Sequence, residues 1–465
     1  MACMAWRSIA AALATRVVWT LVANPAVALG IENNSVTSHI TIDGGRTLLA
    51  NDRVREAEQS VAAALRDGAG DDLLCLWGEI QFRRANFTEA GAAFDSATKR
   101  NPRNARAWWG LGRIEEIHFR RDRARELFAK AYGLDPRDTD IILSYLDGMP
   151  DARNRTMLLR DVISLSSADN PRRAALAVAQ IQIEERLGGR AAGRLASAYT
   201  TYRVPLSGFH PASARQDGLL VAVRINGGKT LHLVLDTGAR GIFVDARATK
   251  NLGLEPIVES RVAGFGAGEA AESQVALARS LAIGDLAFEN CLIQVSRQSM
   301  TAGADGILGA GVFERFRMRV DVHSHAMDLT PIEQPLQGEI GRIPAIGQRN
   351  LLLVRTAVAD REGWFLLDTG AAFTTLARDL VPSAFQGSTA PELVGARGAV
   401  TGAYRLGPLS LAVGRKSLVD MTPVALDLAP LSRREGIEIS GVLGYAALSK
   451  GPFTIDLSRG LVTFE

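Results

Sequence analysis

The 465-residue sequence contains LHLVLDTGAR at residues 231–240 and WFLLDTGAAF at residues 364–373. Each stretch predicts a β-strand that ends in Asp-Thr-Gly-Ala, because turn-forming residues directly follow an apolar run. A single Asp-Thr-Gly is most often an ordinary turn. The two copies therefore indicate a shared function only if the sequence around them is repeated as well.

The surrounding sequence is indeed repeated. Upstream, GLLVAVRINGGKTLHLVLDTG (218–238) and NLLLVRTAVADREGWFLLDTG (350–370) each predict a β-hairpin whose second strand delivers the aspartate. Downstream, at nearly the same spacing in both copies, DGILGAGVFERFRMRVDVHSHAMDL (305–329) corresponds to SGVLGYAALSKGPFTIDLSRGLVTF (440–464). We therefore predict a duplicated β region with a first lobe at 201–330, an inter-lobe linker at 331–349 and a second lobe at 350–465.

A duplicated β lobe suits a site that needs two equivalent carboxyl groups. If Asp236 and Asp368 meet across an approximate twofold axis, at about 3 Å they cannot both be ionised, so they share one proton and titrate as a pair. One carboxylate can then take a proton from a trapped water while the other carboxyl donates a proton to a substrate carbonyl. This chemistry requires neither a metal nor a cofactor.

The residues after each aspartate are expected to hold the pair in place. Thr237 and Thr369 can each hydrogen-bond across the axis to the opposite loop, which makes both turns rigid. Gly238 and Gly370 let the main chain approach the carboxyls closely, where a Cβ atom would clash.

The two Asp-Thr-Gly motifs, each followed by an apolar-apolar-Gly segment (307–309 and 442–444), resemble those of the aspartic proteases, specifically the retropepsin-like branch found in bacterial proteins. The resemblance covers about residues 218–465. It implies a closed pepsin-type β fold in each lobe, an active site completed within one chain, and a protein or peptide substrate. It also implies the roles of the motif residues, with Asp236 and Asp368 as the catalytic pair and Thr237, Gly238, Thr369 and Gly370 as their supports.

The family also carries a β-hairpin flap between each Asp-Thr-Gly and its apolar-apolar-Gly segment. VAGFGAGEA (262–270) and VGARGAVTG (394–402) stand in the corresponding places, and their glycines suit a mobile lid. Ordinary Gly-rich hairpins are the alternative. Pepsin-like enzymes usually carry Ser or Thr after Asp-Thr-Gly, whereas Ala239 and Ala371 stand here. Loss of that hydroxyl donor leaves the pair less acidic, so we expect activity nearer to neutral pH than pepsin's.

Residues 52–200 predict a helical domain, part of which repeats with a 34-residue period. At matching offsets the two clear copies contain Gly78 and Gly112, Ala90 and Ala124, Phe94 and Phe128, and Pro102 and Pro136. This set resembles the tetratricopeptide repeat, in which small residues let paired helices approach, and it implies a groove for a protein partner. A generic helical bundle is the alternative. The expected fold is therefore multidomain: an all-α tetratricopeptide-like solenoid followed by a mainly-β, two-lobed pepsin- and retropepsin-like domain.

The first residues of the chain favour export. Residues 1–28 contain two arginines, a short apolar run and Ala26-Val27-Ala28, the small-x-small pattern of a signal-peptidase site. This predicts a cleaved signal peptide at 1–28 and a linker at 29–51, hence a periplasmic or secreted bacterial protein. An uncleaved anchor or a plain N-terminal helix is the alternative. No later stretch reaches the roughly 20 apolar residues of a membrane span.

Composition argues against several partners and cofactors. The net charge is +3 and the arginines are spread along the chain, so no nucleic-acid partner is expected. Cys3, Cys75 and Cys291 make neither a disulfide framework nor a zinc cluster, so buried free thiols are expected, and a disulfide between the last two is unsupported. His323 and His325 fall on one face of a predicted strand, where we expect surface residues and no metal site.

Three functions remain open from the sequence. The first is an exported aspartic endopeptidase whose helical repeats recruit a protein substrate or a regulator. The second is a catalytically silent peptide-binding protein that keeps the cleft. The third is a scaffold in which the repeats do the work and the β lobes cap them. Two intact aspartates favour the first over the second, and the third leaves the duplicated motif unexplained.

Overall fold

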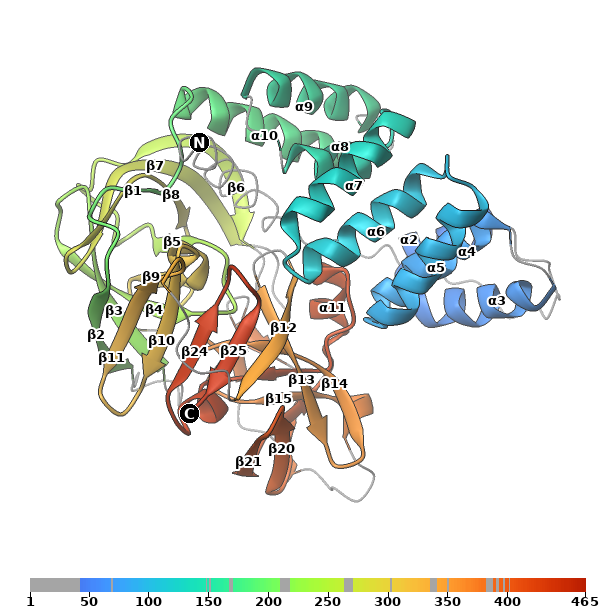
Figure 1. Ribbon diagram of the computed structural model, residues 1–465. Helices are drawn as coiled ribbons and strands as arrows, with labels where there is room; N and C mark the ends of the chain where they lie inside the picture. The colour runs from blue at the N-terminus through green and yellow to red at the C-terminus, as the bar shows by residue number, and fades with distance from the viewer. Residues whose placement is uncertain are drawn as a thin grey trace. The chain divides into compact units, whose positions relative to one another are not determined.

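The structure of the protein is a computed structural model, shown in Figure 1. It describes residues 42–67, 70–147, 149, 152–166, 170–209, 218–262, 271–301, 303–334, 341–348, 351–381, 388–389, 393–395, 398–400 and 402–465. The proposed signal peptide lies outside the described residues. Within them the chain forms two compact units: the helical unit, from residues 42–146 and Ser432–Glu438, and the β unit, from the described residues of 147–431 and Ile439–Glu465.

The helical unit consists of short helices joined by tight turns. Its helices are α2 (Ile42–Ala50), α3 (Val54–Asp67), α4 (Asp71–Arg83), α5 (Phe87–Arg100), α6 (Ala105–Ile117), α7 (Arg121–Leu134) and α8 (Thr139–Leu146). Helix α6 begins where Asn104 accepts a hydrogen bond from the N–H of Ala107 at 3.0 Å, a typical N-cap. Part of the segment that the sequence analysis assigned to a linker forms α2, because Leu49 packs into a cluster with Val61 and Leu76.

Close packing of these helices depends on glycines that face a phenylalanine ring. A Cβ atom built on Gly110 would lie 2.5 Å from Cδ1 of Phe94, and one built on Gly112 would lie 2.5 Å from Cε1 of Phe128. Both rings are buried in the core, so they cannot turn away. The predicted role of Gly112 in letting helices approach is confirmed, whereas Gly110 was not recognised from the sequence.

Replacing Gly110 with Ala is expected to lower the free energy of unfolding of the helical unit by about 1–3 kcal/mol, because the added methyl group overpacks against Phe94. Gly133→Ala in α7 is the matched control, since nothing lies within 4 Å of its Cβ position. The control should leave stability unchanged or raise it by up to about 1 kcal/mol, because Ala favours the helix. Urea unfolding followed by circular dichroism measures both, and equal stability of the two variants would contradict the packing argument.

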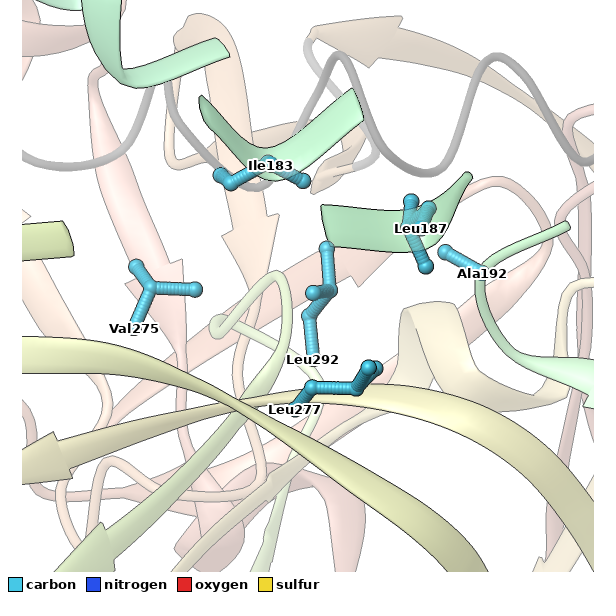
Figure 2. Packing of buried hydrophobic residues seen from close by; sticks show 6 residues of the cluster. All are labelled: Ile183, Leu187, Ala192, Val275, Leu277 and Leu292. Atoms are coloured by element: carbon cyan, nitrogen blue, oxygen red, sulfur yellow. The ribbon is translucent and has the colours of Figure 1, made fainter. Parts of the chain in front are cut away.

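The β unit begins with two helices, α9 (Ala152–Ser166) and α10 (Pro171–Leu187), which the sequence analysis grouped with the repeats. Figure 2 shows Ile183 and Leu187 of α10 above Leu277 and further apolar residues of the sheet. This cluster removes apolar surface of both the helix and the sheet from water. By their packing these helices belong with the strands, and the proposed domain boundaries stay predictions.

The first half of the β unit closes into a barrel. Its strands are β1 (Arg194–Leu195), β2 (Tyr202–Phe209), β3 (Gly218–Ile225), β4 (Thr230–Asp236), β5 (Ile242–Asp245), β6 (Glu255–Val262), β7 (Ala271–Ile283), β8 (Leu286–Ser296) and β9 (Gly306–Gly309). Around the barrel, β3 pairs with β4, β4 with β9, β9 with β5, β5 with β8, β8 with β7, and β7 with β3 again. On β3, Val221, Val223 and Ile225 are buried while Ala222 and Arg224 between them are exposed, the period of two expected of a strand.

The second half repeats this order of pairing. Its strands are β13 (Leu351–Val358), β14 (Arg361–Leu367), β15 (Thr375–Ala377), β16 (Ser388–Thr389), β17 (Leu393–Gly395), β18 (Gly398–Val400), β19 (Tyr404–Arg405), β20 (Leu409–Val413), β21 (Lys416–Met421), β22 (Val424–Leu426) and β23 (Gly441–Leu443). Strand β13 pairs with β14, β14 is parallel to β23, β23 pairs with β15, and β15 is parallel to β22. The pairings match those of β3, β4, β9, β5 and β8 one by one.

Strands of both halves meet in one six-stranded sheet. Its order is β2, β11 (Ala326–Pro331), β10 (Phe316–Asp321), β24 (Phe453–Asp456), β25 (Leu461–Phe464) and β12 (Arg342–Gln348). Strand β12 falls within the segment expected as an inter-lobe linker. Asp321 accepts hydrogen bonds from the N–H groups of His323 and Ser324, so the prediction of a strand at His323 and His325 is wrong, because this carboxylate caps a turn there.

The predicted fold class, helical repeats followed by a mainly-β domain, is confirmed. Cys75 and Cys291 are free and buried, as predicted, and burial raises the pKa of the Cys291 thiol to about 12. Among the described residues, no helix is long and apolar enough to cross a membrane. In the same part of the chain, no three His, Cys, Asp or Glu side chains are grouped so that they could hold a metal ion.

Candidate active site

Asp236 and Asp368 stand at the ends of equivalent hairpins, β3–β4 and β13–β14. The first hairpin turns at residues 226–229, where Asn226 and Gly227 have φ angles of 51° and 71°, in the left-handed region that these two residue types adopt most readily. The apolar residues that precede each aspartate are buried in the core, so the end of each strand is fixed. Both aspartates therefore project from firmly held strand ends.

The two loops are joined by reciprocal hydrogen bonds between Thr237 and Thr369. Thr237 Oγ1 donates to the carbonyl oxygen of Leu367 at 2.9 Å, and Thr369 Oγ1 donates to that of Leu235 at 2.6 Å. Each hydroxyl also accepts a hydrogen bond from the opposite threonine N–H, at 3.0 and 3.1 Å. Both threonines are buried, so water does not compete for these bonds.

Thr237→Val keeps the side-chain volume but leaves the carbonyl of Leu367 and the N–H of Thr369 without this partner. We expect the free energy of unfolding of the β unit to fall by about 2–6 kcal/mol, since each buried unsatisfied group costs about 1–3 kcal/mol. Thr237→Ser keeps the hydroxyl and is the control, with an expected loss of less than about 1.5 kcal/mol. Urea denaturation compares the two, and a Val variant as stable as the Ser variant would contradict the role of the hydroxyl.

Gly238 and Gly370 bring the main chain of each loop against the carboxyl of the other loop. A Cβ atom built on Gly238 would lie 2.5 Å from Cγ of Asp368, and one built on Gly370 would lie 2.5 Å from Cγ of Asp236. Each glycine N–H donates to the carboxylate of its own loop at 2.8 Å, and Ala371 N–H adds a bond to Asp368 at 3.0 Å. The structure thus brings all six residues named from the motif into one place.

The apolar-apolar-Gly segments run directly behind the loops. Strand β9 lies parallel to β4, with Gly309 opposite Asp236. Strand β23 lies parallel to β14, and the Leu443 carbonyl accepts a hydrogen bond from the N–H of Asp368 at 3.1 Å. A Cβ atom on Gly309 or on Gly444 would lie 2.6 Å from a carbonyl oxygen of the adjacent loop, so only glycine allows this approach.

The two carboxyls titrate together. Burial, then the charge of Asp368, then the hydrogen bond between the two side chains raise the pKa of Asp236 well above its ordinary value. The N–H groups of Gly238 and Ala239 lower this pKa only in part. Both aspartates nevertheless keep an intermediate exposure, so water can reach them. At such an approach the pair retains one shared proton well above the pH at which an isolated aspartate loses its own.

The raised pKa makes stability depend on pH in a definite direction. The folded protein binds this proton more tightly than the unfolded chain, so the linked stability is complete below about pH 3.8, the ordinary Asp value, and is lost as the pH rises through the raised pKa. Asp368→Asn removes the repulsion. At about pH 8 we expect this variant to be more stable than the wild type, by about 1.4 kcal/mol for each pKa unit of the rise that Asp368 causes, whereas the part of the rise due to burial remains.

Asp321→Asn is the control, because its effect on stability should have the opposite sign. Hydrogen bonds to the Asp321 carboxylate, of which the one from the Ser324 N–H contributes most, lower the pKa of Asp321. That variant should lose stability at about pH 8. Urea unfolding of both variants at about pH 3.5 and pH 8 provides the measurement. If Asp368→Asn gave no stability gain at the higher pH, the two carboxyls would not be a repelling pair.

Hairpins occupy the places where flaps were predicted. Val262 of β6 pairs with Ala271 of β7, and the connecting residues 263–270 lie outside the described residues. In the second half β17 pairs with β18 within the proposed flap 394–402. Arg378 donates a hydrogen bond to the carbonyl of Gly402 at the end of this hairpin. The flap role of both hairpins stays a prediction.

A side-chain pair beside the second loop was not predicted from the sequence. The guanidinium carbon of Arg405 lies 5.3 Å from the centroid of the Phe373 ring, a cation–π contact. The first loop has Gly241 at the place of Phe373 when the two copies are aligned on their aspartates. Aligning the two copies reveals this difference between the loops. Nothing in the sequence near Phe373, however, predicts its contact with the distant Arg405.

Comparison with known proteins identifies two parts of the chain. Residues 221–312 match the family model described as aspartyl protease, and residues 75–139 match the model described as tetratricopeptide repeat. The resemblance to aspartyl proteases and to tetratricopeptide repeats that the sequence predicted is confirmed at this level, and the bacterial retropepsin-like branch stays a prediction. The protease match contains Asp236 and ends before Asp368.

One solved structure similar to this chain is the crystal structure of an aspartic proteinase from Irpex lacteus. It is 14% identical with a TM-score of 0.40, and the match covers 57% of this chain and 98% of that chain. No curated protein matches the sequence.

Proposed function

We propose that the protein is an aspartic endopeptidase that hydrolyses peptide bonds with a water molecule activated between Asp236 and Asp368. The observation that carries the proposal is the reciprocal contact of the two loops. Each glycine lies against the opposite carboxyl, and each threonine is hydrogen-bonded to the opposite strand. Such a cradle suits chemistry that needs two carboxyls at one point.

In the proposed reaction the pair begins with one proton. The ionised carboxylate takes a proton from water, the water oxygen attacks the carbonyl carbon of the peptide bond, and the protonated carboxyl donates its proton to the carbonyl oxygen. The tetrahedral diol then breaks its C–N bond as the protonated carboxyl of the pair gives its proton to the amine nitrogen and the other carboxylate takes a proton from a hydroxyl of the diol. The acid and the amine leave, and the pair again holds one proton. No covalent intermediate with the protein forms.

The hydrogen bonds around the pair support this mechanism. Donors already in place stabilise charge without reorganising during the reaction, and firmly held loops keep both carboxyls in reach of one water. Ala239 and Ala371 supply no hydroxyl to the outer carboxylate oxygens. We infer from this, and from the raised pKa of Asp236, that the pair works nearer to neutral pH than pepsin does.

We further propose that the substrate is a protein or peptide and that the tetratricopeptide repeats recruit this substrate or a regulator. The signal-like residues 1–28 support export to the periplasm or the medium. A catalytically silent peptide-binding protein is the second candidate, favoured by the missing Ser or Thr after both Asp-Thr-Gly motifs.

Asp236→Asn and Asp368→Asn are each expected to lower kcat/KM for an unstructured protein substrate by about 10²–10⁴-fold, because either change removes one partner of the acid–base pair. Cleavage followed by mass spectrometry of the products between about pH 3 and pH 8 measures this. The wild-type rate is expected to peak well above pH 3. Asp321→Asn, at a turn of the six-stranded sheet, is the control and should keep the wild-type rate.

Each of the other outcomes points to a different function. A wild-type protein that binds peptides but cleaves none across this pH range would support the silent binding protein. Full activity in both Asn variants would place catalysis elsewhere. A rate that peaks below about pH 3 would contradict the expected effect of Ala239 and Ala371.

A further inference from the structure

The short segment Ser432–Glu438 lies in the sequence of the second half of the β unit but packs within the helical unit. Its last residue is held there by charge and by a backbone bond. The Glu438 carboxylate pairs with Arg84 and lies 3.7 Å from Arg55. The Glu438 N–H donates to the carbonyl oxygen of Arg83 at 2.7 Å.

The surroundings of this ion pair make it a firm anchor. Arg84 lies between two carboxylates, since it also pairs with Glu58 at 3.0 Å. The side chains of Arg84 and Glu438 are only 23% and 32% exposed, so solvent screens the pair less than it screens a surface ion pair. Ile437 and Ile439, on either side of Glu438, are each 1% exposed. The chain is therefore fixed before, at and after Glu438.

From this anchor the chain passes within a few residues to the catalytic loop. The N–H of Ser440 donates to the carbonyl of Trp364 at 2.9 Å, and strand β23 then runs parallel to β14. The carbonyl of Leu443 accepts the N–H of Asp368 itself. A shift of the segment after Glu438 along β14 would therefore move the hydrogen bond that holds the backbone of Asp368.

The first half holds the equivalent strand in a different way. The N–H of Asp245 donates to the carbonyl of Asp305 at 2.9 Å. In the same place of the second half, the N–H of Ala377 donates to the carbonyl of Ser440 at 2.8 Å. In the first half the Asp245 carboxylate also binds the segment that leads into β9, because it accepts a hydrogen bond from Ser299 Oγ at 2.7 Å. Ala377 has no carboxylate, so it cannot hold the corresponding segment of the second half in this way.

We propose that Arg84 and Glu438 are positioning residues for the proposed hydrolysis. Their ion pair replaces the missing internal anchor, fixes the start of β23 and, through the carbonyl of Leu443, the place of Asp368 opposite Asp236. This role is independent of any partner that the repeats bind. The inference rests on the proposed function of the pair of aspartates.

The test uses charge reversal and a charge-conserving variant in the full chain. Arg84→Glu and Glu438→Arg are each expected to lower kcat about 10-fold, with KM changed by less than about twofold, because a displaced carboxyl affects chemistry more than binding. Arg84→Lys keeps a cation between Glu58 and Glu438 and is expected to keep kcat within about threefold of the wild type. Arg120→Glu, which breaks the Arg120–Glu115 pair of the same unit, is the control and should keep both constants.

Amide hydrogen exchange gives a second readout that does not depend on activity. Peptides that cover residues 364–370 and 440–444 are expected to exchange about 10-fold faster in the charge-reversal variants Arg84→Glu and Glu438→Arg and at the wild-type rate in the Arg120→Glu control. Wild-type kcat and unchanged exchange in the two charge-reversal variants would overturn the inference, as would a loss of kcat in Arg84→Lys as large as that in Arg84→Glu. If the wild type cleaves nothing, the proposed function fails, and the exchange rates still decide whether Glu438 holds the loop of Asp368.

Discussion

The hydrogen bonds between Thr237 and Thr369 hold together two loops whose carboxyl groups repel each other. Two half-exposed aspartates would separate in water, where each could be solvated alone. The buried threonine hydroxyls prevent this, because separating the loops would leave strand carbonyls and N–H groups unsatisfied in the core. Burial and then the charge of Asp368 raise the pKa of Asp236, so the repulsion acts on top of the cost of burying the carboxyls. The site is therefore kept under electrostatic strain by neutral hydrogen bonds.

This constraint explains why the two copies are alike around the aspartates and different elsewhere. The strand, the turn and the backing segment of each copy meet near one point, so Gly238, Gly370, Gly309 and Gly444 all stand where a Cβ atom would clash. Residues further from that point are free to differ. Phe373 has no counterpart in the first loop, and the buried Asp245 carboxylate has none in the second half. The copies thus share the cradle and differ in what surrounds it.

Local features of the sequence were sufficient to predict the cradle. An apolar run before Asp-Thr-Gly, a glycine where the backbone must come close, and a 34-residue helical period each have a direct local cause. Long-range contacts were not readable in this way. The apolar residues of α10 predict that another element covers this face of the helix, but they do not predict that the element is the strand that contains Leu277. The turn at His323 was mistaken for a strand, because its cause is the capping carboxylate of Asp321 and not a break in apolar pattern. The pairing of Arg84 with Glu438 depends on two residues far apart in the chain, and neither belongs to a motif.

A site shared between two halves also sets a condition on folding. Each half contributes only one of the two aspartates, Asp236 or Asp368. The repulsion between their carboxyls and the proposed hydrolysis are therefore possible only after both halves have come together. The six-stranded sheet provides the register for this step, because β10 of the first half pairs directly with β24 of the second. Each of these strands follows closely on a backing segment, 306–309 or 441–444, that contacts its loop. Pairing of β10 with β24 therefore brings the two Asp-Thr-Gly loops to the distance at which the threonine hydroxyls can bond across. The same β-sheet hydrogen bonds that join the halves thus help to hold two carboxyls closer than their charges alone would allow.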